Sequence, residues 1–514
     1  MLPKINNFSK PLQLAIIESI FTSLMTGSAM VFVIPFAIYL GANSIQIGLI
    51  TALPALLAAW FQLSSLKLLK FYTRKKIVMA TVFIQATTWM IIAILPFIAP
   101  FNQIGILIAL TTVGTVIMSI GNPLWNSWVR KLASKEILGE YFGARNALAG
   151  VVVFLTTIIC GITLDLAKPN YTLLAFFGIF SIGFIGRILA LMIFAKIEDP
   201  KLEYNEIEKG VSLIEFTTHL TKTNFGNFIL LGTFLTFTTA MISPYIYFHL
   251  LENLGLKNNY FVFTALISAA TISSIISLPY WGRIIDKYGS AKLLKATTIL
   301  SCFFPLFLII IQDPTLLFFL QIWDGVLFSG LTLSLSNFIY ETFNQKKIIQ
   351  YSIFQAIFFG TATFFGTVFS GIIQINEINF FSLAVPFYSV CLIAVILRLT
   401  IASTLIWKVK DAIKAKPIKE EELVLRVLTI APIREVFYNN TIFIITKTST
   451  VAKKIENETI KKLEKAEKKL VKEVKLVEEL TKKKLLKPKK QKNRKSMIET
   501  KDQNSKKLIF KGNK

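Results

Sequence analysis

Long apolar stretches follow one another along this 514-residue chain from residue 11 to residue 407. A stretch of about 20 residues crosses the ~30 Å hydrocarbon core of a bilayer as an α-helix. The stretches show no strict alternation of apolar and polar positions, so helices are favoured over the strands of a barrel. We therefore expect an all-α membrane protein with twelve spans, near residues 12–40, 45–66, 77–99, 103–129, 146–167, 171–195, 225–251, 259–281, 293–311, 315–343, 350–374 and 380–407.

The 56 Lys and Arg residues are sorted between alternate loops of these spans. With the N-terminus inside, 21 lie in or beside the inward segments, and only Lys168 and Lys257 lie in outward loops. Arg187 and Arg398 fall within spans, and the other 31 follow from Lys408. Basic loops stay in the cytoplasm. The bias predicts a multi-pass protein of the cytoplasmic (inner) membrane with both termini inside.

Composition supports this class and excludes others. A mean hydropathy of +0.59 with 44 Phe residues is far too apolar for a soluble protein of this length. The three cysteines, Cys160, Cys302 and Cys391, fall inside spans and have no metal or disulfide spacing. No Walker loop is present, so ATP is not the expected energy source. We expect neither a cofactor, nor a metal, nor enzymatic activity.

The spans divide six and six around the long central loop. Pro35 and Pro244 occupy similar places in the two sets, as do Arg187 and Arg398, at an offset of roughly 210–220 residues. A six-helix unit used twice is typical of secondary transporters, with the site between the halves. The domains expected are an N-terminal half at 1–195, a cytoplasmic loop at 196–224 with a surface helix over 211–222, a C-terminal half at 225–407, and a tail at 408–514.

The tail carries 31 basic and 14 acidic residues, which is +17 of the formal net charge of +26. Residues 408–445 keep apolar content and are expected to pack on the inner face. Leu463, Leu470 and Val477 repeat every seven residues within a Lys/Glu-rich helix, and 487–514 reads as disordered. A solvated extension and a segment that binds anionic lipid both remain open.

One loop motif follows the eighth span and contains Gly282, Arg283, Asp286, Lys287, Gly289 and Lys292. It resembles the loop motif of the major facilitator superfamily. The match consists of glycines that permit a tight turn, an aspartate able to cap a helix or pair with arginine, and several basic residues. The resemblance implies the twelve-helix fold of that superfamily and a cytoplasmic latch that opens during alternating access. The equivalent loop of the first half, 65–76, keeps only the basic character.

A second motif surrounds the loop after span four and looks like one shared by bacterial members of the superfamily whose substrate is undefined. Pro123 is expected to break or kink span four and to free a carbonyl near the inner gate. Trp125 and Trp128 read equally well as aromatic anchors at the membrane interface. The other residues of the motif are Asn122, Gly139, Tyr141, Phe142, Gly143, Arg145 and Asn146.

Ionisable side chains within spans are few and therefore informative. Asp324, flanked by Trp323 and Gly325, is the leading candidate for proton coupling or substrate binding, with a structural pair to an arginine as the alternative. Glu18 lies close to the inner end of span one and suggests an inner-gate pair. The pathway candidates are Asp324, Glu18, Asn122, Trp125 and Trp323, and Arg187 and Arg398 are interpreted as members of structural charge pairs.

The leading functional hypothesis is a monomeric secondary transporter that moves a small solute by rocking two six-helix halves, with the proton as candidate coupling ion. A membrane-anchored scaffold or sensor acting through the basic tail is an alternative. A lipid-handling facilitator is another, because the chain is rich in Phe and poor in polar cavity residues. Its partners would be the solute and the bilayer, with anionic lipid a candidate contact of the tail.

Topology is the first prediction. Single cysteines at positions 43 and 257, replacing Asn43 and Lys257, should react with an impermeant thiol reagent in intact cells. Cysteines replacing Lys75 and Lys347 should react only after permeabilisation, because basic loops stay in the cytoplasm. Labelling of position 347 in intact cells would contradict the predicted orientation.

Overall fold

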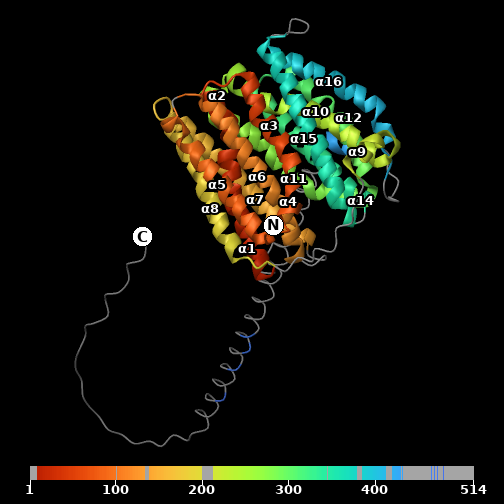
Figure 1. Cartoon of the computed structure of the whole chain (residues 1–514), viewed down its shortest axis with the longest axis horizontal. Coiled ribbons are helices and arrows are strands. Elements are labelled where there is room, and N and C mark those ends of the chain that lie inside the picture. The colour runs from red at the N-terminus through yellow and green to blue at the C-terminus, as the bar shows by residue number, and fades with distance from the viewer. Residues whose placement is uncertain are drawn as a thin grey trace, which may run out of the picture. The chain divides into compact units, whose positions relative to one another are not determined.

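The computed structural model is all-helical (Figure 1). Twelve of its helical segments are long and apolar enough to cross a membrane, which confirms the predicted number of spans. The residues described are 8–99, 101–132, 138–199, 212–343, 345–378, 385–411 and 420–429, with single positions 431, 465, 468, 472 and 479. The predicted heptad positions Leu463, Leu470 and Val477 and the segment 487–514 lie outside them.

The first six spans contain one irregularity. Span one is α1, π-helix η2 and α2 in continuous succession, and Pro11 lies in the first turn of α1, where its missing N–H costs nothing. The Gly27 carbonyl in η2 accepts a hydrogen bond from Thr157 at 3.0 Å. The elements are α1 Lys10–Met25, η2 Thr26–Met30, α2 Val31–Tyr39, α3 Ser44–Phe61, α4 Ser64–Leu68, α5 Arg74–Ile98, α6 Gln103–Leu132, α7 Leu138–Ala167 and α8 Thr172–Lys196.

The second set of spans follows a short connecting helix, α9, close to the predicted surface helix. Span nine differs from expectation, because it is divided into α12 and α13 just before Pro305. The elements are α9 Leu213–Thr218, η4 Leu220–Lys222, α10 Asn224–Phe248, η5 His249–Asn253, η6 Leu256–Asn258, α11 Tyr260–Tyr288, α12 Ser290–Ser301, α13 Phe304–Ile310, α14 Pro314–Thr342, α15 Gln345–Ile375, α16 Pro386–Thr404, η8 Ile406–Lys408 and α17 Glu420–Leu428.

Pro123 does not break span four. It lies inside α6, which continues as one helix from Gln103 to Leu132. A proline removes one hydrogen bond of a helix, and in a membrane bundle neighbouring helices hold the segment in line. The expected break is therefore wrong.

The most extensive contacts between the halves are two helix pairs: α3 packs against α15, beside which it lies in Figure 1, and α7 packs against α11. We call the end of the bundle with Lys168 and Lys257 the neutral end, and the opposite end, with Arg74 and Lys292, the basic end. One hydrophobic cluster, with Phe36, Phe176, Tyr245 and Phe263 among its members, draws on both halves and lies toward the neutral end.

The basic end is built differently. Of the three further hydrophobic clusters in the described residues, one contains residues of the first half only, around Trp128. The others, around Phe338 and around Trp281, contain only residues that follow the first half. The halves thus share an apolar core toward the neutral end, whereas each has its own core toward the basic end.

Each half closes its own basic end with an aspartate that follows its sixth span. Asp199 pairs with Arg74 at 2.6 Å and accepts the backbone N–H of Lys75 at 3.1 Å, at the start of α5. Asp411 pairs with Lys292 at 3.5 Å, near the start of α12. A carboxylate at a helix N-terminus is favoured by the helix dipole. The sixth span of each half is thereby tied to the third.

After Asp411 the chain adds a short amphipathic helix, α17, to the basic end of the second half. Leu423 is fully buried in the cluster around Trp281, whereas Leu425 is 60 % exposed. Arg426 donates to the Tyr280 hydroxyl at 2.8 Å and pairs with Glu422, and these hydrogen bonds raise the pKa of Arg426. Of residues 408–445, the described helix α17 therefore packs on the basic end of the second half.

We predict that the chain can be shortened to residue 446 but not to residue 419. Removal of 447–514 leaves every span and α17 in place, so folding and transport should be nearly unchanged. Removal from Glu420 uncovers the Leu423 site and should lower the melting temperature of the purified protein in detergent.

Two substitutions on α17 provide the matched control. Leu423→Asp places a charge in an apolar site and should destabilise the docked state by roughly 2 kcal/mol or more. Leu425→Asp makes the same change on the exposed side and should have little effect. Equal melting temperatures for the two variants would show that α17 is not docked.

Candidate functional site

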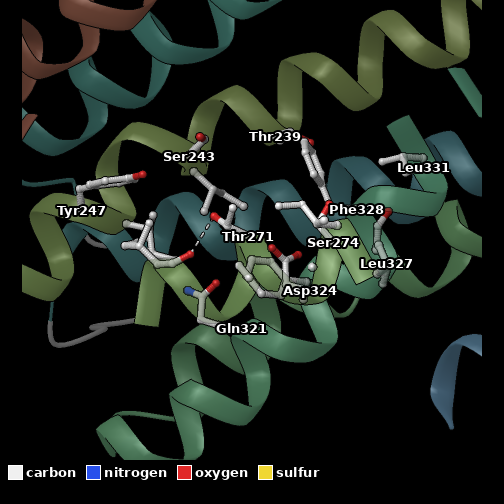
Figure 2. A pocket seen from close by; sticks show the side chains of 18 of the residues that line it. Thr239, Ser243, Tyr247, Thr271, Ser274, Gln321, Asp324, Leu327, Phe328 and Leu331 are labelled. Atoms are coloured by element: carbon white, nitrogen blue, oxygen red, sulfur yellow. Dashed lines mark hydrogen bonds between the residues drawn. The ribbon is translucent and has the colours of Figure 1, made fainter. Parts of the chain in front are cut away.

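The second half contains a cavity of about 400 Å³ among α10, α11, α12, α13, α14 and α16. Figure 2 shows Gln321 and Asp324 of α14 together with the hydroxyl-bearing side chains of α10 and α11 around this space. Apolar side chains, including Phe304 and Phe328, complete the lining. The cavity combines one carboxylate, one amide, several hydroxyls and an apolar wall. Its polar residues are Thr239, Ser243, Tyr247, Thr271, Ser274, Ser301, Gln321, Asp324 and Arg398.

Asp324 reaches this cavity because α14 lies very close to α11. A Cβ added to Gly325 would be 2.2 Å from the Ala270 carbonyl oxygen and 2.0 Å from the Ser273 hydroxyl, so only glycine permits the approach. The Asp324 side chain is half-buried and makes no hydrogen bond or ion pair in the described part of the chain, and the charge of Arg398 at the same cavity acts on it from a longer distance. A carboxylate within a span that has no hydrogen bond is a candidate for substrate binding or proton transfer.

Arg398 lies at the same cavity and is tied to the backbone. Its Nη1 donates to the Ser301 carbonyl at 2.6 Å, and Nε and Nη2 donate to the hydroxyls of Thr238 and Thr239 at 3.1 and 2.9 Å. Pro305 explains the first bond: it has no N–H for the carbonyl four residues earlier, which is Ser301. The break in span nine therefore creates the acceptor that holds Arg398.

The first half has a polar network at the corresponding helices. Glu18 on α1 is buried, pairs with Arg145 at 3.3 Å and accepts the Thr22 hydroxyl at 2.5 Å. Arg187 on α8 is 1 % exposed and donates to the Thr22 hydroxyl at 2.8 Å and to the Met118 sulfur at 3.0 Å. Glu18 thus forms an ion pair with Arg145 and is linked to Arg187 through the Thr22 hydroxyl.

The two arginines of the sixth spans occupy equivalent places. Arg187 on α8 donates to Thr22 on α1, and Arg398 on α16 donates to Thr238 on α10. In both halves the partner is a threonine of the first span instead of a carboxylate. The internal repeat indicated the equivalence, whereas the hydroxyl partners could not be read from spacing along one chain.

The aromatic pathway candidates are mostly part of the packing. Trp128 is fully buried and donates to the Glu198 carbonyl at 2.7 Å, so it is not an anchor at the membrane surface. Trp125 packs edge-on against Trp128 and Phe194. Trp323 packs edge-on against Phe307, and Asn122 is exposed on α6.

The residues of the second motif lie in different environments. Tyr141 is buried and packs edge-on against Phe8, Arg145 joins the Glu18 network, and Asn146 is exposed on α7. The side-chain environments of Gly139, Phe142 and Gly143 lie outside the described residues. The motif therefore contributes Arg145 to the buried network of the first half.

The latch motif surrounds the turn between α11 and α12. Gly289 has φ +89°, which only glycine adopts easily, whereas Gly282 lies within α11 with open space beside it. Asp286 is exposed and makes no ion pair with any described residue. The carboxylate that caps α12 is Glu341, which accepts the Ser290 N–H at 2.9 Å and its hydroxyl at 2.6 Å.

Comparison with known proteins identifies the family to which the chain belongs. The family model of the Major Facilitator Superfamily matches residues 17–278 and 229–452. The chain therefore belongs to this superfamily: it is a membrane transporter that moves a solute, and it is not an enzyme. Among curated proteins, none matches this chain in sequence.

Two solved transporters share this fold. The nucleoside transporter NupG is 12 % identical, with a TM-score of 0.58 over 78 % of this chain and 100 % of its own. A bacterial homolog of the human lysosomal transporter Spinster, in an inward-facing and unoccupied conformation, is 12 % identical, with a TM-score of 0.55 over 78 % of this chain and 96 % of its own. At this identity the likeness concerns the fold alone.

Proposed function

We propose that this protein is a secondary active transporter that moves a small polar solute by alternating access between residues 8–199 and 212–411. The basic end faces the cytoplasm, as the distribution of Lys and Arg predicts. The Asp324 carboxylate in the second-half cavity, which has no hydrogen bond or ion pair among the described residues, carries the proposal, because an ionisable group within a span marks a substrate or ion pathway. In this proposal the protein works as a monomer within the lipid bilayer.

The conformation supports a rocking mechanism. The halves share a core toward the neutral end and have separate cores toward the basic end. Two bodies that share contacts at one end can separate at the other without disturbing their own packing. We infer a state that is closed at the neutral end, with the cavity reached from the basic end.

The cavity favours a neutral solute with several hydroxyl groups. Asp324 and Arg398 contribute opposite charges, so the cavity has no net charge to attract an ion. Gln321 and the surrounding hydroxyls offer hydrogen-bond partners, and Phe304 and Phe328 offer an apolar face. Sites with convergent polar groups on an apolar wall suit small molecules of mixed character. Nucleosides, the substrates of the structural neighbour NupG, have this chemistry and belong in the first panel.

Lipid handling is the second candidate. An apolar groove of about 520 Å³ lies among α3, α9, α10 and α15, and its lining includes Trp60, Phe234, Phe358 and Phe365. Its lining contains no charged side chain. Uptake of hydroxylated solutes into proteoliposomes favours the first function, whereas movement of fluorescent lipid between leaflets without solute uptake favours the second.

The Asp324→Asn variant should separate binding from proton coupling. If the carboxylate carries the proton, uptake driven by a pH gradient should fall about tenfold or more while exchange of internal for external solute persists. If it binds the solute, both should fall. Asp313→Asn, the same change at the start of α14 and outside the cavity, is the matched control. Unchanged uptake and exchange in Asp324→Asn would contradict a role for this carboxylate.

Asp286 is proposed to engage the latch in the other conformation, where the basic ends of the halves meet. Asp286→Asn keeps the size and removes the charge, so transport should fall severalfold while the protein still inserts and purifies as a monodisperse species. Lys287→Gln, next to it in the motif, tests whether the charge of the loop matters in general. Normal transport by Asp286→Asn would remove the latch hypothesis.

A further inference from the structure

The neutral end contains a polar contact between the halves that the sequence motifs do not include. Asp165, at the end of α7 in the first half, accepts the backbone N–H groups of Tyr260 and Phe261, the first two residues of α11 in the second half. The distances from nitrogen to carboxylate oxygen are 2.8 and 2.6 Å. The single carboxylate of Asp165 thus accepts two backbone hydrogen bonds from the opposite half.

These two N–H groups have no partner within their own helix. The first donors of any α-helix lack an acceptor in the helix and carry its positive dipole end. In α11 the third donor, Val262 N–H, is satisfied locally by Asn259 at 3.1 Å. The cap of α11 is therefore shared: its own half supplies Asn259, and the other half supplies Asp165.

Lys168 strengthens the same contact. Its Nζ pairs with Asp165 at 2.8 Å and lies 4.3 Å from the centre of the Tyr260 ring. Asp165 and Lys168 have side chains only about a quarter exposed, so water screens the group incompletely. One turn before Asp165 in α7, a Cβ added to Gly161 would be 2.3 Å from the Thr264 hydroxyl. This short distance shows how closely α7 and α11 approach.

We propose that Asp165 is the gate clasp of the neutral end: it holds the two halves closed by capping α11 across the interface and must release α11 each time this end opens. The proposal rests on the alternating-access function proposed above and adds the residue that sets the balance between its two states. Release leaves the Tyr260 and Phe261 N–H groups to water, so closure is favoured without being irreversible.

The chain offers a matched control for this clasp. Asp313 has the same chemistry, because its carboxylate accepts the N–H groups of Thr315 and Leu316 at 2.9 and 3.0 Å at the start of α14. Both of its partners lie in its own half. Loss of Asp313 therefore weakens a helix cap without changing the attraction between the halves.

The test measures the distance between the halves and needs no known solute. Spin labels at positions 171 and 319, replacing the exposed Tyr171 and Phe319, report the separation at the neutral end in nanodiscs. The background lacks the native cysteines Cys160, Cys302 and Cys391. Asp165→Ala should increase the ratio of long to short distances about five- to tenfold, whereas Asp313→Ala should leave it unchanged.

A second variant approaches the clasp from the opposite half. Phe261→Pro removes the donor of the 2.6 Å bond, and proline is tolerated in the first turn of a helix. Phe261→Pro should shift the distances between the two spin labels to longer values, as Asp165→Ala does. If Asp165→Ala is unstable, Phe261→Pro alone tests the clasp. An unchanged distribution in Phe261→Pro, or an equal shift in Asp313→Ala, would overturn the clasp. Because transport is not the readout, this result is independent of whether Asp324 binds the solute.

Discussion

A bilayer core offers no water to a backbone carbonyl that loses its helical partner, and this constraint shapes the interior of the protein. Pro305 frees the Ser301 carbonyl, and Arg398 satisfies it at 2.6 Å. Pro244 frees the Ala240 carbonyl, and the Thr367 hydroxyl donates to it at 3.2 Å. An unsatisfied carbonyl costs about 1–3 kcal/mol, so a side chain from another helix stabilises the span at each of these two prolines. Of the two side chains, Arg398 also lines the second-half cavity.

The two halves share one arrangement of polar contacts but differ in the surroundings of the carboxylates within their spans. In each, an arginine of the sixth span contacts a threonine of the first, and an aspartate after the sixth span contacts the start of the third. In the first half the buried Glu18 pairs with Arg145 and connects to Arg187 through Thr22. In the second half Asp324 faces open space and shares the cavity with Arg398 without an ion pair between them in the described residues. The repeat therefore supplies the framework, and its departure from symmetry marks the candidate site.

Conformational change in such a fold depends on contacts between the halves, and these are unlike at the two ends. Toward the neutral end the halves share an apolar core and the Asp165 cap of α11. Toward the basic end the described clusters belong to single halves, and Asp286 remains exposed. Short-range polar contacts are suited to a gate, because each can exchange its partner for water at small cost.

The sequence by itself determined the number of spans, because a span is set by its own length and hydrophobicity. It also indicated the repeat and singled out Asp324, since a charge within a span is visible in one dimension. Only the tertiary structure decided that Asp165 caps α11, that Glu341 in place of Asp286 caps α12, and that Trp128 is buried. The cap of α11 joins residues 95 positions apart, and the cap of α12 joins residues 51 positions apart. The burial of Trp128 depends on neighbours from several helices. A helix pattern fixes which side chains share a face of one helix, whereas their partners depend on how the helices pack.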